Sequence, residues 1–212
     1  MKVLLINGSP DPKGCTFTAL DIIARRLEEQ GIETKLYQIG KKPVQGCMDC
    51  GGCAKAGKCV AADDLVNEVS AELETSDGII VGSPVHYGSA TGAVTAFMDR
   101  LCFSTPASRK RMKFAAAVVS CRRGGATATF DQLTKYFAMN QMPIVPSCYW
   151  NMVHGFTPED VYADKEGVRT MQILADNMAY LIKCKTAANL PLPEEPAMVM
   201  THFVREDLLN QN

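Results

Sequence analysis

Short apolar runs alternate with longer amphipathic segments along most of the chain. The short runs have the length of β-strands, and they cover residues 3–6, 33–39, 78–81, 114–119 and a short stretch near Ile144. In the longer segments apolar residues share one helical face, which predicts helices over residues 16–29, 63–75, 93–103, 129–139 and 166–183. Asp63 is the expected N-cap of the second helix. The run at 78–81 is nearly all apolar, as expected for a strand that is buried on both faces.

Five strands separated by helices predict an α/β fold, with a doubly wound parallel sheet and helices on both faces. In such sheets ligands bind beyond the carboxyl ends of the strands, so the loops that follow the strands carry the candidate chemistry. We expect one domain over residues 1–186 and an extended tail over residues 187–212, which contains Pro191, Pro193 and Pro196. The tail either packs on a neighbouring subunit or is a loosely ordered end.

Composition narrows the class of partner. The 212 residues are 47% hydrophobic and 21% charged, as in ordinary globular proteins. A formal net charge of -1 weighs against nucleic acid or an anionic membrane as the main partner. No apolar run approaches the roughly 18 residues of a membrane span, and the N-terminal run is shorter than the core of about 7 to 15 residues of a signal peptide. We therefore expect a cytoplasmic protein with reduced thiols.

The loop after the first strand reads GSPDPKGCTFT, residues 8–18. Its glycines permit close backbone approach, Ser9, Thr16 and Thr18 offer hydroxyls, and the next helix points its N-terminal amides at the loop. Neither the GxxxxGK[ST] nor the GxGxxG pattern is present, which favours a phosphate monoester over ATP, GTP or a dinucleotide. The alternative is a plain turn between strand and helix.

The loop after the third strand reads GSPVHYGSATG, residues 82–92. Pro84 fixes the backbone and Gly88 loosens it, so Val85, His86 and Tyr87 are expected to form a platform for a flat aromatic ring. His86 is either a proton donor or, as is more common for a lone loop histidine, a packing and hydrogen-bonding residue.

The loop after the fourth strand contains two adjacent arginines. Arg122 and Arg123 stand beside Gly124 and Gly125, where they could reach a cofactor edge or the phosphates of a nicotinamide nucleotide. The alternative is a solvated arginine pair. The segment CYWNMVHG at 148–155 follows the fifth strand and either lines the pocket or forms a subunit contact. A phosphate grip, a platform for a planar ring and a polar edge are together what FMN requires.

Four cysteines, Cys47, Cys50, Cys53 and Cys59, follow the pattern C-x2-C-x2-C-x5-C. Such close spacing allows several thiolates to converge on a compact cluster, and the glycines among them allow the backbone to wrap it. Zinc sites more often separate two C-x2-C pairs by a longer segment. An iron-sulfur cluster, free thiols or a disulfide, and zinc all stay open.

These motifs together resemble the flavodoxin-like superfamily, specifically NADPH-dependent FMN reductases and, within them, iron-sulfur flavoproteins. The matching pieces are GSPDPKGCT, the cysteine run, GSPVHYGS, RRGG and YWNMVHG, in the expected order. The resemblance implies a five-stranded sheet in the order 2-1-3-4-5, bound FMN and a homodimer or homotetramer. It assigns phosphate binding to Ser9, Cys15, Thr16, Phe17 and Thr18, ring binding to Pro84, Val85, His86, Tyr87 and Gly88, and the far ring edge to Cys121, Arg122, Arg123, Gly124 and Gly125. It also assigns the four clustered cysteines to a four-iron four-sulfur cluster.

The resemblance implies an FMN-dependent oxidoreductase. Electrons would pass from NAD(P)H or reduced ferredoxin through FMN to a quinone, a flavin, a nitro or azo compound, or oxygen. No side chain need act as a catalytic acid or base, because the flavin carries the chemistry. The alternative is an electron carrier between protein partners. We expect the cysteine loop at the carboxyl side of the sheet, near the FMN of its own chain or of a neighbour.

Overall fold

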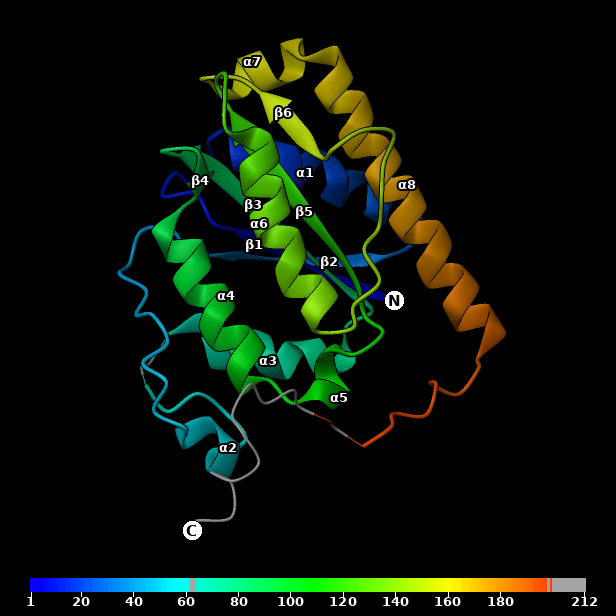
Figure 1. Ribbon diagram of the computed structural model, residues 1–212. Helices are drawn as coiled ribbons and strands as arrows, with labels where there is room; N and C mark the ends of the chain where they lie inside the picture. Colours follow the sequence, from blue (N-terminus) through cyan, green and yellow to red (C-terminus); the bar gives the residue numbers. More distant parts are fainter. Residues whose placement is uncertain (62–63, 198, 200–212) are drawn as a thin grey trace.

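The computed structural model describes residues 1–61, 64–197 and 199. A sheet in the order β2-β1-β3-β5-β6 forms the centre, and every pair along this path is parallel (Figure 1). A short strand, β4, adds an antiparallel pair at the end of β3. The strands are β1 Lys2–Asn7, β2 Glu33–Gln38, β3 Gly78–His86, β4 Ser89–Ala90, β5 Phe114–Cys121 and β6 Met152–His154.

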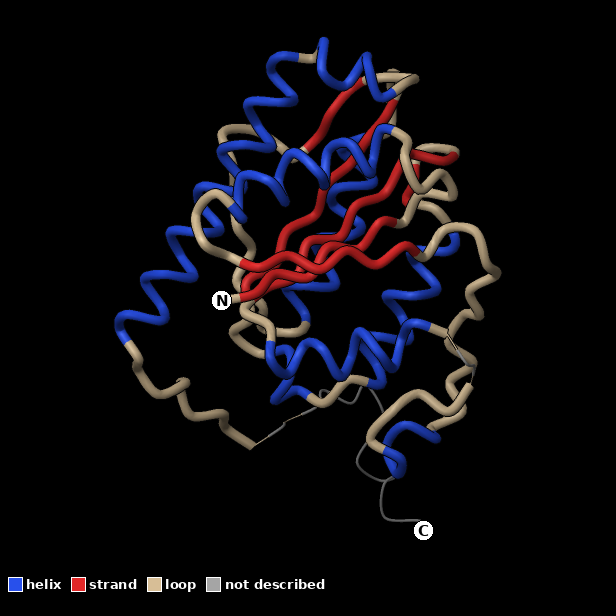
Figure 2. Tube along the Cα trace, turned by 180° about the vertical axis from the view of Figure 1, so that it is seen from behind, coloured by secondary structure: helices blue, strands red, loops and turns tan. Residues whose placement is uncertain are grey.

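Helices cover both faces of the sheet (Figure 2). One face carries α1 Cys15–Glu28, α7 Pro158–Ala163 and α8 Lys165–Ala188. The other carries α3 Leu65–Thr75, α4 Gly92–Ser104 and α6 Ala126–Met139. Two short helices, α2 Gly52–Ala56 and α5 Ala107–Lys110, lie beyond this second layer, near the C-terminal end of α4.

The strand β1, which lies between β2 and β3, contributes to both hydrophobic cores because alternate side chains point to opposite faces. Val3 and Leu5 pack in the core under α1 and α8, whereas Leu4 and Ile6 pack in the core under α3 and α4. All four side chains are fully buried. A strand that is covered on both faces needs apolar residues at every position, and the apolar runs in the sequence have this property.

The α/β fold class and the parallel sheet are confirmed, and the five-strand order is the expected one once the short β4 is set aside. The prediction of a fifth strand near Ile144 is wrong. Ile144 forms an isolated bridge with Ala115, and β6 lies at Met152–His154, inside the segment expected to be a loop. Pro143 and Pro146 flank Ile144, and proline has no amide hydrogen to continue a ladder of hydrogen bonds.

The boundaries of several strands and helices differ from the prediction. The strand β3 runs on to His86, and α8 continues to Ala188, beyond the expected domain boundary at 186. The expected cap Asp63 lies outside the described residues. The described cap of α3 is Asp64, which accepts a hydrogen bond from Val66 N at 3.1 Å. Among the residues that the structure describes, no helix is long and apolar enough to span a membrane.

Candidate functional site

Side chains at the ends of β1 and β2 fix the shape of the first loop. Asn7 is fully buried, and its Nδ2 donates to Gln38 Oε1 at 2.6 Å. Asn7 Oδ1 accepts from Ser9 N at 3.1 Å, and Gln38 Nε2 donates to Ser9 O at 2.6 Å. A Cβ at Gly40 would lie 1.7 Å from Ser9 O, so only glycine allows this close approach. Ser9 is therefore held in place from both strands.

The start of α1 has amides to offer an anion, whereas its threonine hydroxyls are already engaged. Thr16 Oγ1 shares a hydrogen bond of 2.8 Å with Ser120 Oγ, and Thr18 Oγ1 donates to Gly14 O at 3.1 Å. The N-cap Gly14 provides no side-chain acceptor, so the first amides of the helix, from Cys15 to Phe17, have no cap. An uncapped helix N-terminus suits a phosphate group.

The thiol of Cys15 at this helix start is neutral. Burial raises its pKa, and the nearby carboxylates of Asp160, Asp11 and Glu159 raise it further. Cys15 therefore contributes no negative charge against an incoming phosphate, although the carboxylates themselves do.

The predicted platform is a tight β-hairpin between β3 and β4. Tyr87 and Gly88 both have positive φ, 51° and 76°, as a type I′ turn requires. The hairpin pairs Val85 with Ala90 and His86 with Ser89, and it leaves the Tyr87 side chain fully exposed at the tip. Gln132 of α6 braces β4, because its Oε1 accepts from Ser89 Oγ at 2.9 Å and from Ala90 N at 3.0 Å.

The loop that carries Arg122 and Arg123 contacts this hairpin directly. Gly125 has φ 89°, and a Cβ there would lie 2.7 Å from Val85 Cγ1 and 2.8 Å from Gly88 Cα. Arg122 and Arg123 are exposed and form no salt bridge with any described residue. Cys121 is buried, and this burial raises the pKa of its thiol. Two guanidinium groups of this loop thus have no carboxylate partner in the described part of the chain.

Hydrogen bonds also join the first loop to the hairpin. Gly8 N donates to Gly82 O at 2.8 Å, and Thr91 Oγ1 donates to Gly8 O at 2.9 Å. A Cβ at Gly82 would lie 2.8 Å from Thr16 Cγ2, which shows how closely α1 approaches β3. The structure therefore brings the three predicted loops together at the carboxyl edge of the sheet.

The segment around β6 adds aromatic residues beside the third loop. Gly155 N donates to Cys121 O at 3.1 Å. Tyr149 and Trp150 are about half exposed, with ring centroids 4.7 Å apart in an edge-to-face arrangement. The His154 backbone amide donates to Asp164 Oδ2 at 2.7 Å. This segment borders the candidate site.

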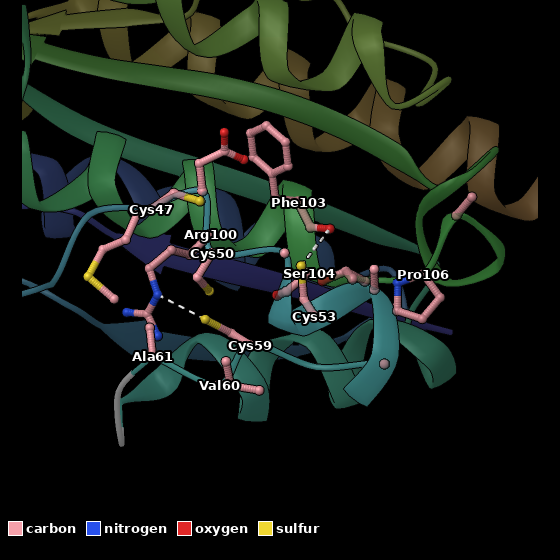
Figure 3. Close-up of a pocket in the computed structure, with 17 residues that line it drawn as sticks. Cys47, Cys50, Cys53, Cys59, Val60, Ala61, Arg100, Phe103, Ser104 and Pro106 are labelled. Carbon is pink, nitrogen blue, oxygen red and sulfur yellow. Dashed lines mark hydrogen bonds between the residues drawn. The ribbon is translucent and has the colours of Figure 1, made fainter. Parts of the chain in front are cut away.

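The four clustered cysteines line a separate cavity of about 560 Å³ (Figure 3). Its other wall comes from the C-terminal end of α4 and the start of α5, including Arg100, Phe103 and Pro106. Because α4 begins next to Thr91 at the first loop, about 14 Å of helix separates that loop from Arg100 at the near wall of the cavity. The expectation that the cysteine loop lies at the carboxyl side of the sheet is wrong. Residues 39–51 form no helix or strand and lead the chain away from that edge.

The thiols share the cavity without converging. Cys47 and Cys50 are exposed, and Cys53 and Cys59 are half-buried. Across the described ranges, no three histidine, cysteine or acidic side chains lie close enough to hold a metal ion. The cysteines of these ranges are all free thiols. Cys59 Sγ accepts from Arg100 Nε at 3.2 Å.

Several residues that shape the two sites were not predicted from the sequence. Asn7, Gln38 and Gln132 shape the loops through amide side chains, which carry no spacing signal of their own. Arg100 did have a signal in the sequence, because it lies on the apolar face of α4 together with Phe97 and Leu101. A charged residue at a core position of an amphipathic helix indicates a buried ionic contact.

Comparisons with known proteins identify the family of this chain. A family model described as NADPH-dependent FMN reductase matches residues 1–157. An iron-sulfur flavoprotein of Methanocaldococcus jannaschii is 32% identical over 193 residues, which cover 86% of this chain and 98% of that protein. An iron-sulfur flavoprotein of Archaeoglobus fulgidus is 28% identical over 84% of this chain and 95% of its own length.

Solved structures show the same fold at low sequence identity. RosB with a bound 8-demethyl-8-formylriboflavin-5'-phosphate has a TM-score of 0.70 at 13% identity, over 97% of this chain and 96% of that one. A flavodoxin from the domain Archaea has a TM-score of 0.57 at 16% identity, over 86% of this chain and 99% of its own. The fold is flavodoxin-like, and the family match and the relatives show that this chain belongs to the NADPH-dependent FMN reductase family of flavin-dependent oxidoreductases.

Proposed function

We propose that the protein takes electrons from NAD(P)H onto FMN and passes them to a small-molecule acceptor, such as a quinone, a flavin, a nitro or azo compound, or oxygen. The observation that carries this proposal is the meeting of three loops around the uncapped start of α1 at the carboxyl edge of the sheet. Bound FMN would supply the electron chemistry, and the protein supplies binding, orientation and electrostatics.

Each loop has a distinct task in this proposal. The first amides of α1, together with Ser9, hold the phosphate. The hairpin from Pro84 to Gly88 faces the flat ring, and Gln132 holds the hairpin rigid. Arg122 and Arg123 attract the phosphates of the nicotinamide nucleotide, because their guanidinium groups have no carboxylate partner among the described residues. Cys121 to Gly125 border the far edge of the ring, and His86 contributes a polar group beside it.

The cysteine cavity favours a second function, an electron carrier that exchanges electrons with reduced ferredoxin or another protein. Four thiols on one cavity wall are a donor set that fits a four-iron four-sulfur cluster. Two of them are exposed, so the loop has room to close around the cluster. The iron-sulfur flavoproteins among the relatives support this assignment.

The length of α4 bears on how the two sites would exchange electrons. About 14 Å of α4 lies between the first flavin loop and the near wall of the cysteine cavity at Arg100 within one chain. We therefore propose a homodimer or homotetramer in the cytoplasm, in which the cysteine loop of one chain approaches the flavin of another.

Anaerobic purification followed by absorbance titration tests both functions. For the enzyme, we expect NADPH to bleach the flavin absorbance and an added quinone to restore it over many cycles. Fast bleaching by reduced ferredoxin with negligible NADPH oxidation would instead select the electron carrier. A colourless protein that takes up no FMN would overturn both.

A further inference from the structure

Arg100 of α4 lies between the two ends of the cysteine loop. Its side chain is only 1% exposed, although arginine is among the residues least often buried. Nη1 donates to Gln45 O, just before the first cysteine, at 3.3 Å, and Nε donates to Cys59 Sγ, the last cysteine, at 3.2 Å. Nη1 also forms an ion pair with Asp64, the cap of α3. One side chain therefore fastens the start and the end of the loop to the second helical layer.

The ion pair keeps Arg100 charged in this buried place. Burial lowers its pKa, but the hydrogen bonds to Asp64 and Cys59 more than offset this, so the pKa lies above its usual value. A guanidinium group donates through five N–H bonds in a fixed plane, so three acceptors do not exhaust it.

Unpaired donors also collect at the wall of this cavity. Arg100 Nη2, Ser104 Oγ and Thr105 Oγ1 are buried and have no hydrogen-bond partner among the described residues. The three residues line the same cavity as the four cysteines. A buried donor without a partner costs about 1–3 kcal/mol, so these three groups gain free energy if a ligand in this cavity accepts hydrogen bonds from them. The sulfur atoms of an iron-sulfur cluster are acceptors of this kind.

We propose that Arg100 is a positioning residue for the cluster, which holds Cys59 in place and, with Ser104 and Thr105, donates hydrogen bonds toward the cluster sulfurs. This inference rests on the proposed cluster. A fixed positive charge beside the cluster stabilises its reduced form, which carries one more negative charge, so Arg100 raises the reduction potential. The same contacts slow the loss of iron, because they hold Cys59 and the start of the loop at the cavity wall.

The test compares Arg100→Gln and Arg100→Lys with the wild-type protein, all purified without oxygen. The matched control is Arg109→Gln, which removes the same charge from a half-buried arginine of α5 that pairs with Glu74. Measurements are iron and sulfide per chain, the rate of iron loss to a chelator, the cluster potential by spectroscopic titration, and FMN content as a check of the fold.

Arg100→Gln is expected to lose iron about 10–100-fold faster and to lower the cluster potential, whereas Arg100→Lys keeps most of the potential. Arg109→Gln should match the wild type. Unchanged iron retention and potential in Arg100→Gln would overturn the inference. A wild-type protein that binds no iron would instead overturn the proposed cluster.

If Arg100→Gln fails to fold, the double variant Ser104→Ala with Thr105→Val tests the inference, because it removes two donors without changing charge. This pair should lower the potential, and an unchanged potential would count against the inference.

Discussion

Gly124 and Gly125 are neighbours in the third loop, yet the structure gives them very different surroundings. Gly125 has a positive φ and touches the hairpin, whereas a Cβ at Gly124 would meet no atom within 4 Å. We predict that Gly125→Ala destabilises the protein by about 1–2 kcal/mol through backbone strain and pushes the hairpin away, so that FMN binds more weakly. Denaturant unfolding and FMN fluorescence titration measure the two effects.

Gly124→Ala is the matched control, and its free energy of unfolding should stay within about 0.5 kcal/mol of the wild type. Equal FMN affinities for the two variants would show that contact between the third loop and the hairpin does not shape the flavin site.

The Cys102 thiol should react more slowly than the thiols of the cysteine loop. Burial raises the pKa of the Cys102 thiol to about 11, with Lys110 only partly opposing it, whereas Cys47 is exposed. Because the thiolate is the reactive form, a raised pKa leaves only about one Cys102 in a thousand reactive at pH 8. Alkylation of iron-free protein at pH 8, mapped by mass spectrometry, should label Cys47 first. The labelling of Cys102 should rise with pH toward 11. Labelling of Cys102 as fast as Cys47 would contradict the raised pKa of its thiol.

At the scale of elements, α4 joins the two sites, and Thr91 fixes its first turn. Thr91 Oγ1 accepts from Val94 N at 3.3 Å and donates to Gly8 O at 2.9 Å. Thr91→Val keeps the shape but removes the helix cap and leaves a buried carbonyl unpaired. We predict a loss of about 1–2 kcal/mol in the free energy of unfolding, together with weaker FMN binding, measured by chemical denaturation and FMN titration.

Thr95→Val is the control for this change, because among the described residues the Thr95 hydroxyl donates only to carbonyls of the same helix and its cap, Thr91 O and Gly92 O. Its loss should be smaller and its FMN affinity normal. A larger effect at Thr95 than at Thr91 would contradict the role of Thr91 as the link between α4 and the first loop.

Elements with a strong periodic pattern were predictable from the sequence, and the others were not. The apolar runs of β1 and β3 and the amphipathic faces of α1 and α3 identified the α/β fold. The helices α2, α5 and α7 span four to six residues, too few to show a helical period. The three residues of β6 pair with β5, and this long-range pairing leaves little trace in so short a segment.

Candidate loops were predictable for the same reason as the strands that they follow, but their internal contacts were not. The sequence places Ser9, Val85 and Gly125 after strands, and parallel strands end at one edge. The sequence does not show that the hydroxyls of Thr16 and Ser120 share a hydrogen bond. Nor does it show that residues 39–51 carry the cysteines to the C-terminal end of α4. Both depend on three-dimensional packing between segments that are distant in sequence.

At the scale of the whole molecule, the described part of the tail folds back on its own chain. Arg111 Nη2 donates to Pro193 O at 2.7 Å, and Gln141 Nε2 donates to Glu195 Oε1 at 2.9 Å. These contacts are exposed, so each contributes less than about 1 kcal/mol to the free energy of unfolding.

Removal of residues 190–212, which keeps the Asn189 cap of α8, should leave cooperative unfolding and FMN content unchanged. Loss of the cooperative transition would contradict a domain that ends near residue 186. Light scattering on the same variant tests whether the tail contributes to the proposed oligomer.

The most direct test of the flavin site is an anaerobic absorbance titration of the FMN-loaded protein with an electron donor, NADPH or reduced ferredoxin. We predict close to one FMN per chain, complete bleaching by one of these donors, and recovery of the flavin spectrum when a quinone is added. Gly124→Ala should behave in the same way, and Gly125→Ala should hold less flavin. A protein that binds no FMN at the strand-end loops, or a bound flavin that neither donor reduces, would contradict the proposed function.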